Sequence, residues 1–243
     1  MERLYLETVD STNKYAKEHI NEISDNSIVY TYNQTAGRGR LNRSWNNTGA
    51  DNIYASLVLK PSDTMQEVYS NLTQYLCVVL AETFEEYGVK PTIKWPNDIQ
   101  INGKKISGIL AESVFEAGKL RGLVLGVGIN LNTSLEYLNK IDQPATSLNI
   151  EIGQKVDKEN FLEKLLNRFC LLYNRFIEEG FVLIKDDYVK RTSFLNKEIT
   201  VKVFDKSIRG IATEIMQNGA LKLLDVNKEE HILLIGDILW MKF

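Results

Sequence analysis

Residues 92–131, TIKWPNDIQINGKKISGILAESVFEAGKLRGLVLGVGINL, contain the pattern that decides the fold of this chain. Short runs rich in Ile, Val and Leu are separated at Asn102-Gly103, a pair typical of two-residue hairpin turns, and at Ala117-Gly118, which indicates a second turn. A hairpin turn joins antiparallel strands, whereas neighbouring parallel strands need a long crossover connection. The stretch therefore predicts a mainly antiparallel sheet and argues against a doubly wound parallel fold.

Three predicted strands and a short helix precede this stretch. The strands cover residues 4–8, 27–32 and 52–59, and the last of them alternates so that one side is apolar. The short helix follows the first of these strands, and Ser11 or Thr12 can cap its N-terminus. The apolar side of 52–59 consists of Ile53, Ala55, Leu57 and Leu59.

Two longer helices are predicted from apolar residues spaced by three and four positions. The first runs from Val68 to Tyr87, and the second covers residues 158–179, between Asp157 as a cap and Gly180 as a stop. Cys77 and Cys170 fall within these helices, and we expect both to be buried free thiols. The buried stripe of the second helix would consist of Phe161, Leu162, Leu165, Phe169, Leu172, Tyr173 and Phe176.

From about Lys197 onward the chain contains only short predicted strands, two of them separated by Asn218-Gly219. Strands this short and evenly spaced favour a small closed β-barrel of about 45 residues. We therefore expect an α+β protein with two parts. Residues 1–193 would form a mixed, largely antiparallel sheet with helices, and residues 194–243 would form the small β-domain.

The composition is that of an ordinary globular protein. Of the 243 residues, 44% are hydrophobic. The net charge of −3 argues against bulk binding to nucleic acids or membrane surfaces, which favours a basic face. The first residues lack an apolar signal core, and no apolar run reaches the ~20 residues of a membrane span. We expect a cytoplasmic protein, without a His-based metal site because only two histidines are present.

A loop at residues 35–45, TAGRGRLNRSW, concentrates positive charge on a flexible backbone. Arg38, Arg40 and Arg43 repel one another, and Gly37 and Gly39 beside them give no conformational restraint. Neither the P-loop pattern nor the dinucleotide-binding fingerprint is present. The loop is therefore either a solvated segment or a binding site for an anion, because guanidinium groups match carboxylate and phosphate geometry.

Three further segments contain residues suited to chemistry. The KWPND turn at 94–98 groups a lysine, an amide and a carboxylate around a rigid proline bend, although an ordinary turn with a buried Trp95 would look the same. Lys105 opens a strand and is either a surface or a functional residue. The glycines of GVGIN at 126–130 indicate either a β-bulge or a close approach of a ligand to the backbone.

Taken together, these segments resemble the motifs of the biotin protein ligases, and the similarity runs along essentially the whole chain. The resemblance implies a catalytic domain like that of class II aminoacyl-tRNA synthetases, followed by a barrel of the Src-homology type. It implies that biotin and ATP are the substrates and that Mg²⁺ is the cofactor. The motifs are STN (11–13), QTAGRGRLNRSW (34–45), KWPND (94–98), KKISGIL (104–110) and GVGIN (126–130).

The same resemblance implies roles for individual residues in forming biotinyl-5′-AMP and transferring biotin to a lysine. Arg40 and Lys105 would lie where the biotin carboxylate meets the α-phosphate. Asp98 would either help to deprotonate the acceptor lysine or organise Mg²⁺. The biotin site would include Ser11, Thr12, Gln34, Arg38 and Gly39, and the nucleotide site Arg43, Trp45, Lys94, Asn97 and Asn130. Asn13, Gly37 and Gly108 complete the implied binding residues.

The implied partner is the biotin carboxyl carrier domain of a biotin-dependent carboxylase, and the protein would be a monomer or a homodimer. Some relatives have an N-terminal DNA-binding domain, but here only ten residues precede STN, so we expect a ligase alone. A lipoate-type ligase and a nucleic-acid-binding module are the alternatives. The family commonly has glycine at the position of Asn42. We expect residues 36–46 to be mobile until biotinyl-adenylate orders them.

Overall fold

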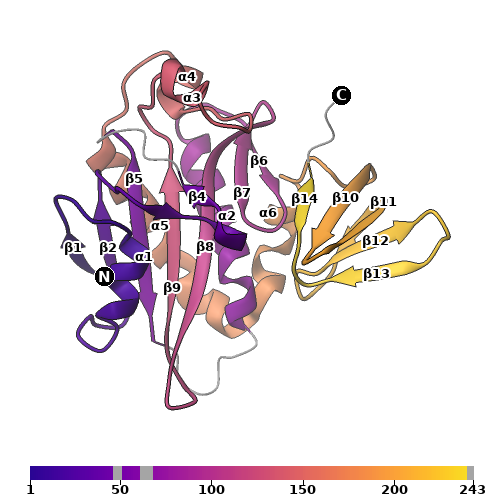
Figure 1. The fold of residues 1–243 in the computed structure, drawn as a ribbon, viewed down its shortest axis with the longest axis horizontal. Helices are drawn as coiled ribbons and strands as arrows, with labels where there is room; N and C mark the ends of the chain where they lie inside the picture. The colour runs from indigo at the N-terminus through magenta and orange to yellow at the C-terminus, as the bar shows by residue number, and fades with distance from the viewer. Residues whose placement is uncertain (46–50, 61–67, 240–243) are drawn as a thin grey trace.

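The computed structural model describes residues 1–45, 51–60 and 68–239. Its larger part is built on a seven-stranded sheet in the order β1-β2-β5-β9-β8-β7-β6 (Figure 1). All neighbouring strands are antiparallel except β1 and β2, which run parallel. The strands are β1 (Glu2–Tyr5), β2 (Ser27–Thr31), β5 (Ile53–Leu59), β6 (Pro91–Lys94), β7 (Asp98–Ile101), β8 (Lys104–Glu116) and β9 (Lys119–Ile129).

The two turns predicted from sequence join β7 to β8 and β8 to β9. Asn102 and Gly103 have φ angles of 51° and 73°, and Ala117 and Gly118 have 49° and 77°. Positive φ at both central residues matches the right-handed twist of the strands that such a turn connects. The predicted antiparallel sheet is therefore confirmed. The first strand lies earlier than predicted, at 2–5 rather than 4–8, because its ladder with β2 ends at the Tyr5–Tyr30 pair and Val9 makes only an isolated bridge to Gln34.

Helices cover both faces of this sheet. α1 (Thr12–Glu18) lies on one face, and α2 (Leu72–Glu85) and α5 (Lys158–Glu179) pack together on the other (Figure 1). β5 is consequently buried on both sides: the four residues predicted to face the core do so, and Val58 packs under α1. The remaining helices are short: α3 (Leu135–Leu138), α4 (Leu148–Ile152), α6 (Lys185–Val189), and the 3₁₀ helices η1 (Arg40–Asn42), η2 (Val68–Asn71) and η3 (Gly180–Ile184).

The long helix α5 has the predicted bounds. The Asp157 side chain accepts a hydrogen bond from the backbone of Asn160, and Gly180 ends the helix with a φ of 69°. Helix α2 starts at Leu72 because the preceding turn is a 3₁₀ helix. Of the predicted α5 stripe, Leu172 and Tyr173 are only partly buried.

The two cysteines differ in burial. Cys77 lies in the core, and burial raises the pKa of its thiol well above the usual value. Cys170 is exposed, so the prediction of a second buried thiol is wrong. The residue directly after Phe169 points about 100° away around the helix, off the buried stripe.

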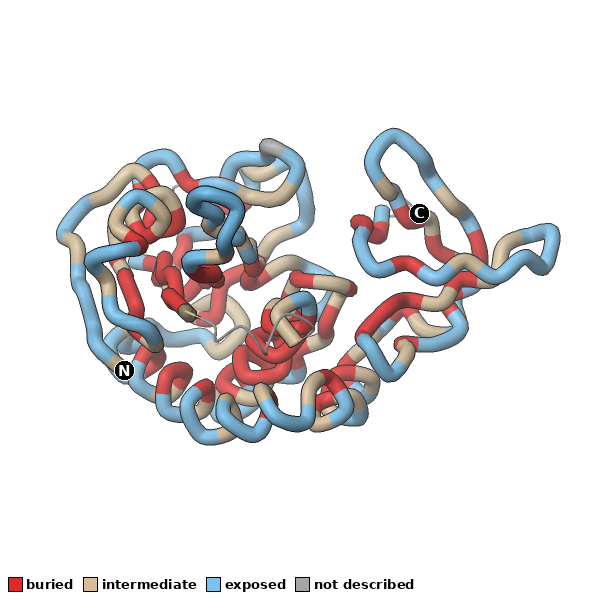
Figure 2. The backbone as a smooth tube through the Cα atoms, turned by 90° about the horizontal axis from the view of Figure 1, so that it is seen from below, coloured by how far each residue is buried: buried red, intermediate tan, exposed pale blue. Residues whose placement is uncertain are grey.

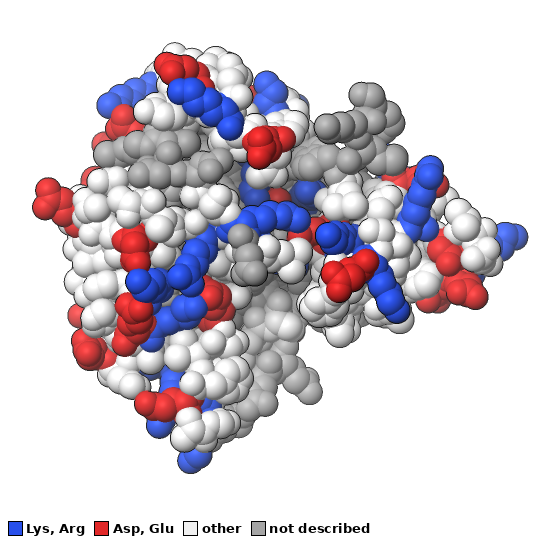
Figure 3. Space-filling view, viewed as in Figure 1, with Lys and Arg blue, Asp and Glu red and all other residues white. Residues whose placement is uncertain are grey.

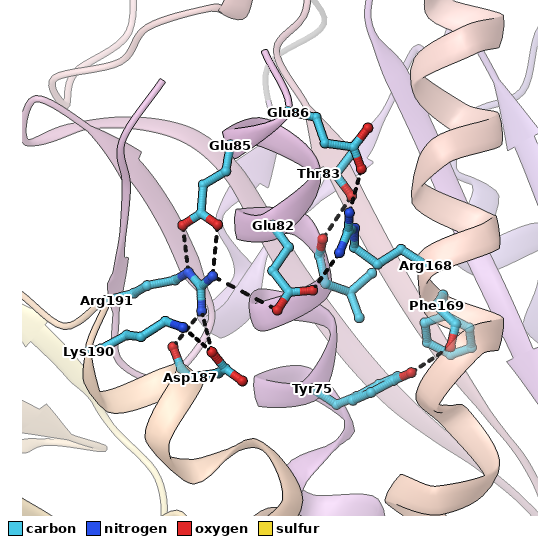
Figure 4. Close-up of polar contacts among 11 residues, drawn as sticks. Tyr75, Glu82, Thr83, Glu85, Glu86, Arg168, Phe169, Asp187, Lys190 and Arg191 are labelled. Carbon is cyan, nitrogen blue, oxygen red and sulfur yellow. Dashed lines mark hydrogen bonds and ion pairs between the residues drawn. The ribbon is translucent and has the colours of Figure 1, made fainter. Parts of the chain in front are cut away.

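An ion-pair network connects α2 to α5 and α6 (Figure 4). Arg191 donates from Nε and from one terminal nitrogen to the two carboxylate oxygens of Glu85, both at 2.8 Å, and also to the backbone oxygen of Asp187. Arg168 donates to Glu82 at 2.9 Å. The Arg191 side chain is only 7% exposed, so this network holds the end of the larger part in place just before the small domain begins.

The small domain is one antiparallel sheet in the order β13-β12-β11-β10-β14. Figure 2 shows it as a lobe beside the larger part, which contains most of the buried backbone. The turn at Gly219 docks this lobe, because its carbonyl oxygen accepts hydrogen bonds from Gln74 and from the Trp95 indole. The strands are β10 (Glu198–Val203), β11 (Lys206–Ile215), β12 (Leu221–Asp225), β13 (Glu230–Leu233) and β14 (Asp237–Leu239).

A small C-terminal β-domain is thus present as predicted. Within the described residues its two edge strands, β13 and β14, are not hydrogen-bonded to each other. The last predicted strand extends to Phe243, and its residues 240–243 lie outside the described part of the chain.

Candidate active site

The arginine-rich loop crosses the sheet face that also carries α1 (Figure 1). It consists of β3 (Gly37–Arg38) and β4 (Ser44–Trp45), which pair antiparallel around η1. A Cβ atom on Gly37 would lie 2.7 Å from both Gln34 Nε2 and the Trp45 carbonyl oxygen, so only glycine fits there. The described part of the loop is therefore tightly built. Its predicted mobility stays a prediction, and residue 46 lies outside the described chain.

Trp45 packs on a pair of glycines in the central strands. Gly108 of β8 and Gly128 of β9 are register partners. A Cβ atom on Gly128 would come within 2.4 Å of the Trp45 ring, and one on Gly108 within 2.9 Å. The strand pairing runs without a bulge through Gly128, so the β-bulge interpretation of GVGIN is wrong, and the close approach of a ligand to this backbone stays a prediction. In this structure the approaching group is the indole.

A polar cavity of about 30 Å³ lies beside this tryptophan, at the start of α1. The Thr12 backbone amide donates to Gln34 Oε1 at 2.9 Å, which leaves the Gln34 amide nitrogen as the donor for a ligand. Ser56 Oγ lies 2.8 Å from Thr12 Oγ1 and 2.6 Å from Asn13 Oδ1. The cavity is lined by Ser11, Thr12, Asn13, Gln34, Arg38, Trp45, Gly108, Leu110, Gly126, Val127 and Gly128.

Asn13 connects α1 to the sheet. Its side-chain nitrogen donates to the Leu110 carbonyl oxygen at 3.1 Å and to Glu112 at 2.9 Å. Its oxygen lies in the space that a Cβ atom on Gly126 would occupy. Asn13 therefore lines the cavity, but its side chain is hydrogen-bonded to other protein groups. Ser56, the hydrogen-bond partner of Asn13, was not predicted as a site residue. The sequence feature that could have indicated it is a serine within a mainly apolar strand.

A cationic cavity of about 70 Å³ adjoins the polar one on the other side of Trp45. Lys105 Nζ lies 2.7 Å from Asp98 Oδ1, and both side chains are mostly buried, at 16% and 14% exposure. The surface interpretation of Lys105 is therefore wrong. The lining residues are Arg38, Gly39, Arg40, Arg43, Ser44, Trp45, Asn97, Asp98, Lys105, Gly108, Ile109, Leu110, Gln143 and Asp237.

One hydrogen bond and one ion pair orient Arg40. Its guanidinium donates to Asn97 Oδ1 at 3.0 Å, and Asn97 in turn donates to the Ile109 carbonyl oxygen at 2.8 Å. Arg40 also lies 3.0 Å from Asp237 Oδ1, while Arg43 lies 3.1 Å from Asp237 Oδ2. Figure 3 shows basic side chains crossing the middle of this face, where the larger part meets the small domain. No local pattern marked Asp237, because it belongs to β14 near the other end of the chain.

Lys94 flanks the cationic cavity as the register partner of Asp98 in the β6–β7 hairpin. Burial lowers the pKa of its ammonium group below the usual value for a lysine. The charges of Asp98 and Asp237 raise this pKa, and those of Lys105 and Arg43 lower it, but burial is the largest cause. Trp95 beside it is buried, as the plain structural interpretation of KWPND required, yet Lys94, Asn97 and Asp98 all lie at the site.

A third space continues from the cationic cavity. Asn130 lines it together with Ser44, Trp45 and Lys105, and Asn130 donates to the Thr146 carbonyl oxygen at 3.0 Å. Ile141, Gln143 and Ala145 line this space as well, and also a larger one of about 700 Å³ beyond it. The segment 141–146 was not recognised from sequence, because it forms neither a strand nor a helix and carries no motif.

The structure thus brings the sequence-predicted residues together along one line of adjoining cavities. Gly37 and Lys94 do not line a cavity but pack directly beside lining residues. A separate cluster in the small domain, Asp225, Glu229 and His231, has ligand atoms within 4.8 Å of one another. The Asp225 carboxylate and the His231 imidazole are hydrogen-bonded to each other at 3.0 Å. None of the three residues lines the cavities described above.

A polar cavity joined to a cationic one is the arrangement expected of an enzyme that brings two anionic substrates together. Comparison with known proteins defines the class further. Residues 5–130 match the Biotin/lipoate A/B protein ligase family. The chain belongs to this family.

Similar proteins of known activity and structure agree with that assignment. The bifunctional ligase/repressor BirA of Bacillus subtilis is 32% identical over 93% of this chain and 70% of its own length. The biotin–[acetyl-CoA-carboxylase] ligase of Paracoccus denitrificans is 30% identical over 90% of this chain and 92% of its own. The structure of biotin protein ligase from Aquifex aeolicus in complex with biotin and ATP matches with a TM-score of 0.84, at 27% identity and covering 98% and 97% of the two chains.

The identification as a ligase of the biotin protein ligase type is confirmed by these comparisons, and so is the α+β fold with its small β-domain. The lipoate-type alternative is not favoured, because the relatives from Paracoccus denitrificans and Mycobacterium tuberculosis are named biotin–[acetyl-CoA-carboxylase] ligases. Among the helices that the structure describes, none is long and apolar enough to cross a membrane.

Proposed function

We propose that this chain activates biotin with ATP as biotinyl-5′-AMP and transfers the biotinyl group to a lysine of a biotin carboxyl carrier domain. One observation carries the proposal. The polar cavity at Thr12 and Gln34 and the cationic cavity at Arg40 and Lys105 adjoin at Trp45. A neutral, hydrogen-bonding ring and an acidic tail on one molecule would occupy such a pair of cavities.

The polar cavity would hold the ureido ring of biotin. Ser11, Thr12 and the Gln34 amide nitrogen offer donors and acceptors of the kind that a cyclic urea needs. At about 30 Å³ the cavity is far smaller than the roughly 300–1,000 Å³ of ordinary ligand pockets. The indole of Trp45 and its loop must therefore move for biotin to enter, which supports the predicted mobility of this loop.

In the first step a carboxylate oxygen of biotin attacks the α-phosphorus of ATP. The new oxygen–phosphorus bond forms as the bond to the β-phosphate bridging oxygen breaks, and pyrophosphate leaves with that electron pair. Both reactants are anions, so cations fixed in a water-excluded site lower their repulsion and stabilise the charge developing at phosphorus. Arg40, oriented by Asn97, and Lys105, oriented by Asp98, would supply those cations.

In the second step the acceptor amine attacks the acyl carbon of the mixed anhydride, AMP leaves, and the amine loses a proton. Asp98 lies 2.7 Å from Lys105 Nζ, so its first role would be to hold that ammonium group. Asp98→Asn should therefore slow adenylate formation more than transfer from preformed biotinyl-AMP. If transfer alone were slowed, Asp98 would act as the base instead.

Mg²⁺ would accompany the nucleotide. Oxygen donors beside the site include the Asp98 and Asp237 carboxylates and the Asn130 amide oxygen, which suit a hard cation. They stand among several lysines and arginines, so the phosphates of ATP would provide the remaining ligands. Mg²⁺ bound in this way neutralises phosphate charge. The adjoining 700 Å³ space at 141–146 would receive the adenosine.

The proposal includes the predicted division of the chain into a catalytic part, residues 1–193, and a small β-domain, residues 194–243. The larger part would hold biotin and ATP, and the small domain would contribute Asp237 to the site. The acceptor would be the carrier domain of a biotin-dependent carboxylase, and the oligomeric state, monomer or homodimer, stays a prediction.

Biotin-dependent exchange of labelled pyrophosphate into ATP tests the first step. We expect exchange with biotin and none with lipoate or with an oligonucleotide added in its place. Incubation with ATP, biotin and a carrier domain, followed by streptavidin detection, tests the second step, with the acceptor Lys→Arg carrier as control. Exchange supported by lipoate alone would contradict the proposal.

A further inference from the structure

The carboxylate of Asp237 bridges two arginines of the loop at 35–45. Its two oxygens lie 3.0 Å from Arg40 and 3.1 Å from Arg43, and the side chain is only 11% exposed. Both are ion-pair contacts slightly longer than the roughly 2.7–2.9 Å of a well-aligned charge-assisted hydrogen bond, and Oδ2 is buried without a hydrogen-bond partner. One anion held between two guanidinium groups is also how a phosphate would be bound here.

Asp237 is placed rigidly by the small domain. It is the first residue of β14 and the register partner of Lys202 in β10. The preceding Gly236 has a φ of 149°, and a Cβ atom there would lie 2.7 Å from Val201 Cγ1. The carboxylate therefore reaches the loop from a fixed backbone, and the contact joins the small domain to the arginines of the active site.

The arginines need such a partner while no substrate is bound. Arg40 and Arg43 carry like charges three positions apart, and their repulsion opposes the compact loop. A carboxylate between them removes that repulsion and holds both guanidinium groups in place. A phosphate that arrives at the same donors would meet a like charge about 3 Å away, which is strongly unfavourable in a partly buried site.

We propose that Asp237 is a positioning residue that holds Arg40 and Arg43 in the free protein and yields them to the phosphates of ATP. Nucleotide binding then breaks this contact between the small domain and the loop. The inference rests on the proposed roles of Arg40 and Arg43 toward the nucleotide. It makes Asp237 a competitor of the substrate anion, so the residue weakens nucleotide binding while it organises the catalytic arginines.

The test separates affinity from turnover. Asp237→Asn keeps the shape of the side chain but removes its charge. We expect its dissociation constant for ATP, measured by calorimetry, to fall about 3- to 10-fold, as loss of two partly exposed ion pairs would give. We expect kcat for pyrophosphate exchange at saturating ATP to stay near that of the parent, because the contact is already broken once the nucleotide is bound. General damage to the site would weaken ATP binding instead.

Two controls accompany this variant. Asp205→Asn changes an exposed acidic residue of the same domain, and it should leave ATP affinity and exchange unchanged. Asp237→Glu restores the charge and should return the affinity toward that of the parent. Unchanged or weaker ATP binding by Asp237→Asn would overturn the inference. Because this readout is ATP binding, it remains informative even if biotin-dependent exchange were absent and the proposed function failed.

The unmodified protein provides a second measurement should Asp237→Asn fail to fold. Amide hydrogen exchange of residues 236–239 should become faster when ATP is added, because the contact that holds this segment to the loop is broken. Slower or equal exchange in this segment with ATP would contradict the release of Asp237.

Discussion

The ring of Trp45 lies against Gly128, so that a Cβ atom on Gly128 would come within 2.4 Å of the indole. The relationship joins the arginine-rich loop to the centre of the sheet, and it places the indole between the polar and the cationic cavity. Both glycines of GVGIN thus serve protein groups, since Gly126 makes room for Asn13.

Gly128→Ala should displace Trp45 and with it the loop that carries Arg40. We expect kcat/KM for biotin in pyrophosphate exchange to fall at least tenfold, because a displacement of about 1 Å can reduce a rate by as much as 100-fold. Gly122→Ala is the control in the same strand, where the new Cβ atom would meet the flexible end of Ile20 at 2.9 Å and the Leu59 carbonyl oxygen at 3.2 Å, and not Trp45. Equal loss in both variants would show that Trp45 is not the cause.

Lys105→Ala should lower the rate of biotinyl-AMP formation by about 10²–10³, the effect of removing one preorganised donor. The variant also leaves Asp98 without its ammonium partner at 2.7 Å. Single-turnover formation of the adenylate measures this rate directly. Lys119→Ala, an exposed lysine at the start of β9, should keep the parent rate. Adenylate formation at the parent rate by Lys105→Ala would remove the lysine from the mechanism.

Nucleotide affinity should fall with rising pH before an ordinary lysine deprotonates. Burial holds the pKa of Lys94 below its usual 10.5, so the free protein loses this cation as pH rises through the lowered value. A bound phosphate stabilises the ammonium form, so binding raises the pKa and takes up a proton. In the same alkaline window the unfolded chain holds more protons than the folded one, and the contribution of Lys94 to stability rises with pH.

Lys94→Arg separates this effect from other titrations, because arginine keeps its charge to much higher pH. Calorimetric titration with ATP between neutral and alkaline pH should show a weaker decline in affinity for the variant than for the parent. Identical pH profiles for the two proteins would mean that Lys94 does not contact the nucleotide.

Arg191→Ala should destabilise the fold by about 2 kcal/mol, less than for a fully buried ion pair because Glu85 is partly exposed. The substitution leaves Glu85 and Asp187 without their shared partner (Figure 4). Denaturant unfolding measures the change. Arg175→Ala removes an exposed pair within α5 and should change the free energy of unfolding by less than about 0.5 kcal/mol.

Trypsin should cleave the loop near Arg40 more slowly when biotin and ATP are present, because the adenylate would neutralise the arginines and order the loop. Arg38, Arg40 and Arg43 are the cleavage sites of this loop, and Leu41 between the last two is exposed. Cleavage that is equally fast with and without ligands would contradict the predicted ordering. Cleavage after an exposed lysine such as Lys119 gives the reference rate.

Much of the fold could be predicted from local patterns. Asn102-Gly103 indicates a hairpin because asparagine and glycine both readily adopt positive φ angles. At the second turn only Gly118 does so readily, and the φ of 49° at Ala117 follows from the pairing of the two strands. The caps of α5 at Asp157 and Gly180 are equally local. The prediction for Cys170 was wrong, because a single residue beside an apolar stripe gives no sign of which way it points.

By itself, then, the sequence determined the antiparallel hairpins, the helix ends and the residue types of the site, since each depends on neighbours a few positions away. Only the tertiary structure placed Asp237 between Arg40 and Arg43, Ser56 beside Asn13, and Trp45 on its two glycines. These contacts join residues far apart in the chain. They arise from how the small domain and the loop pack on the sheet, and no local pattern encodes that packing.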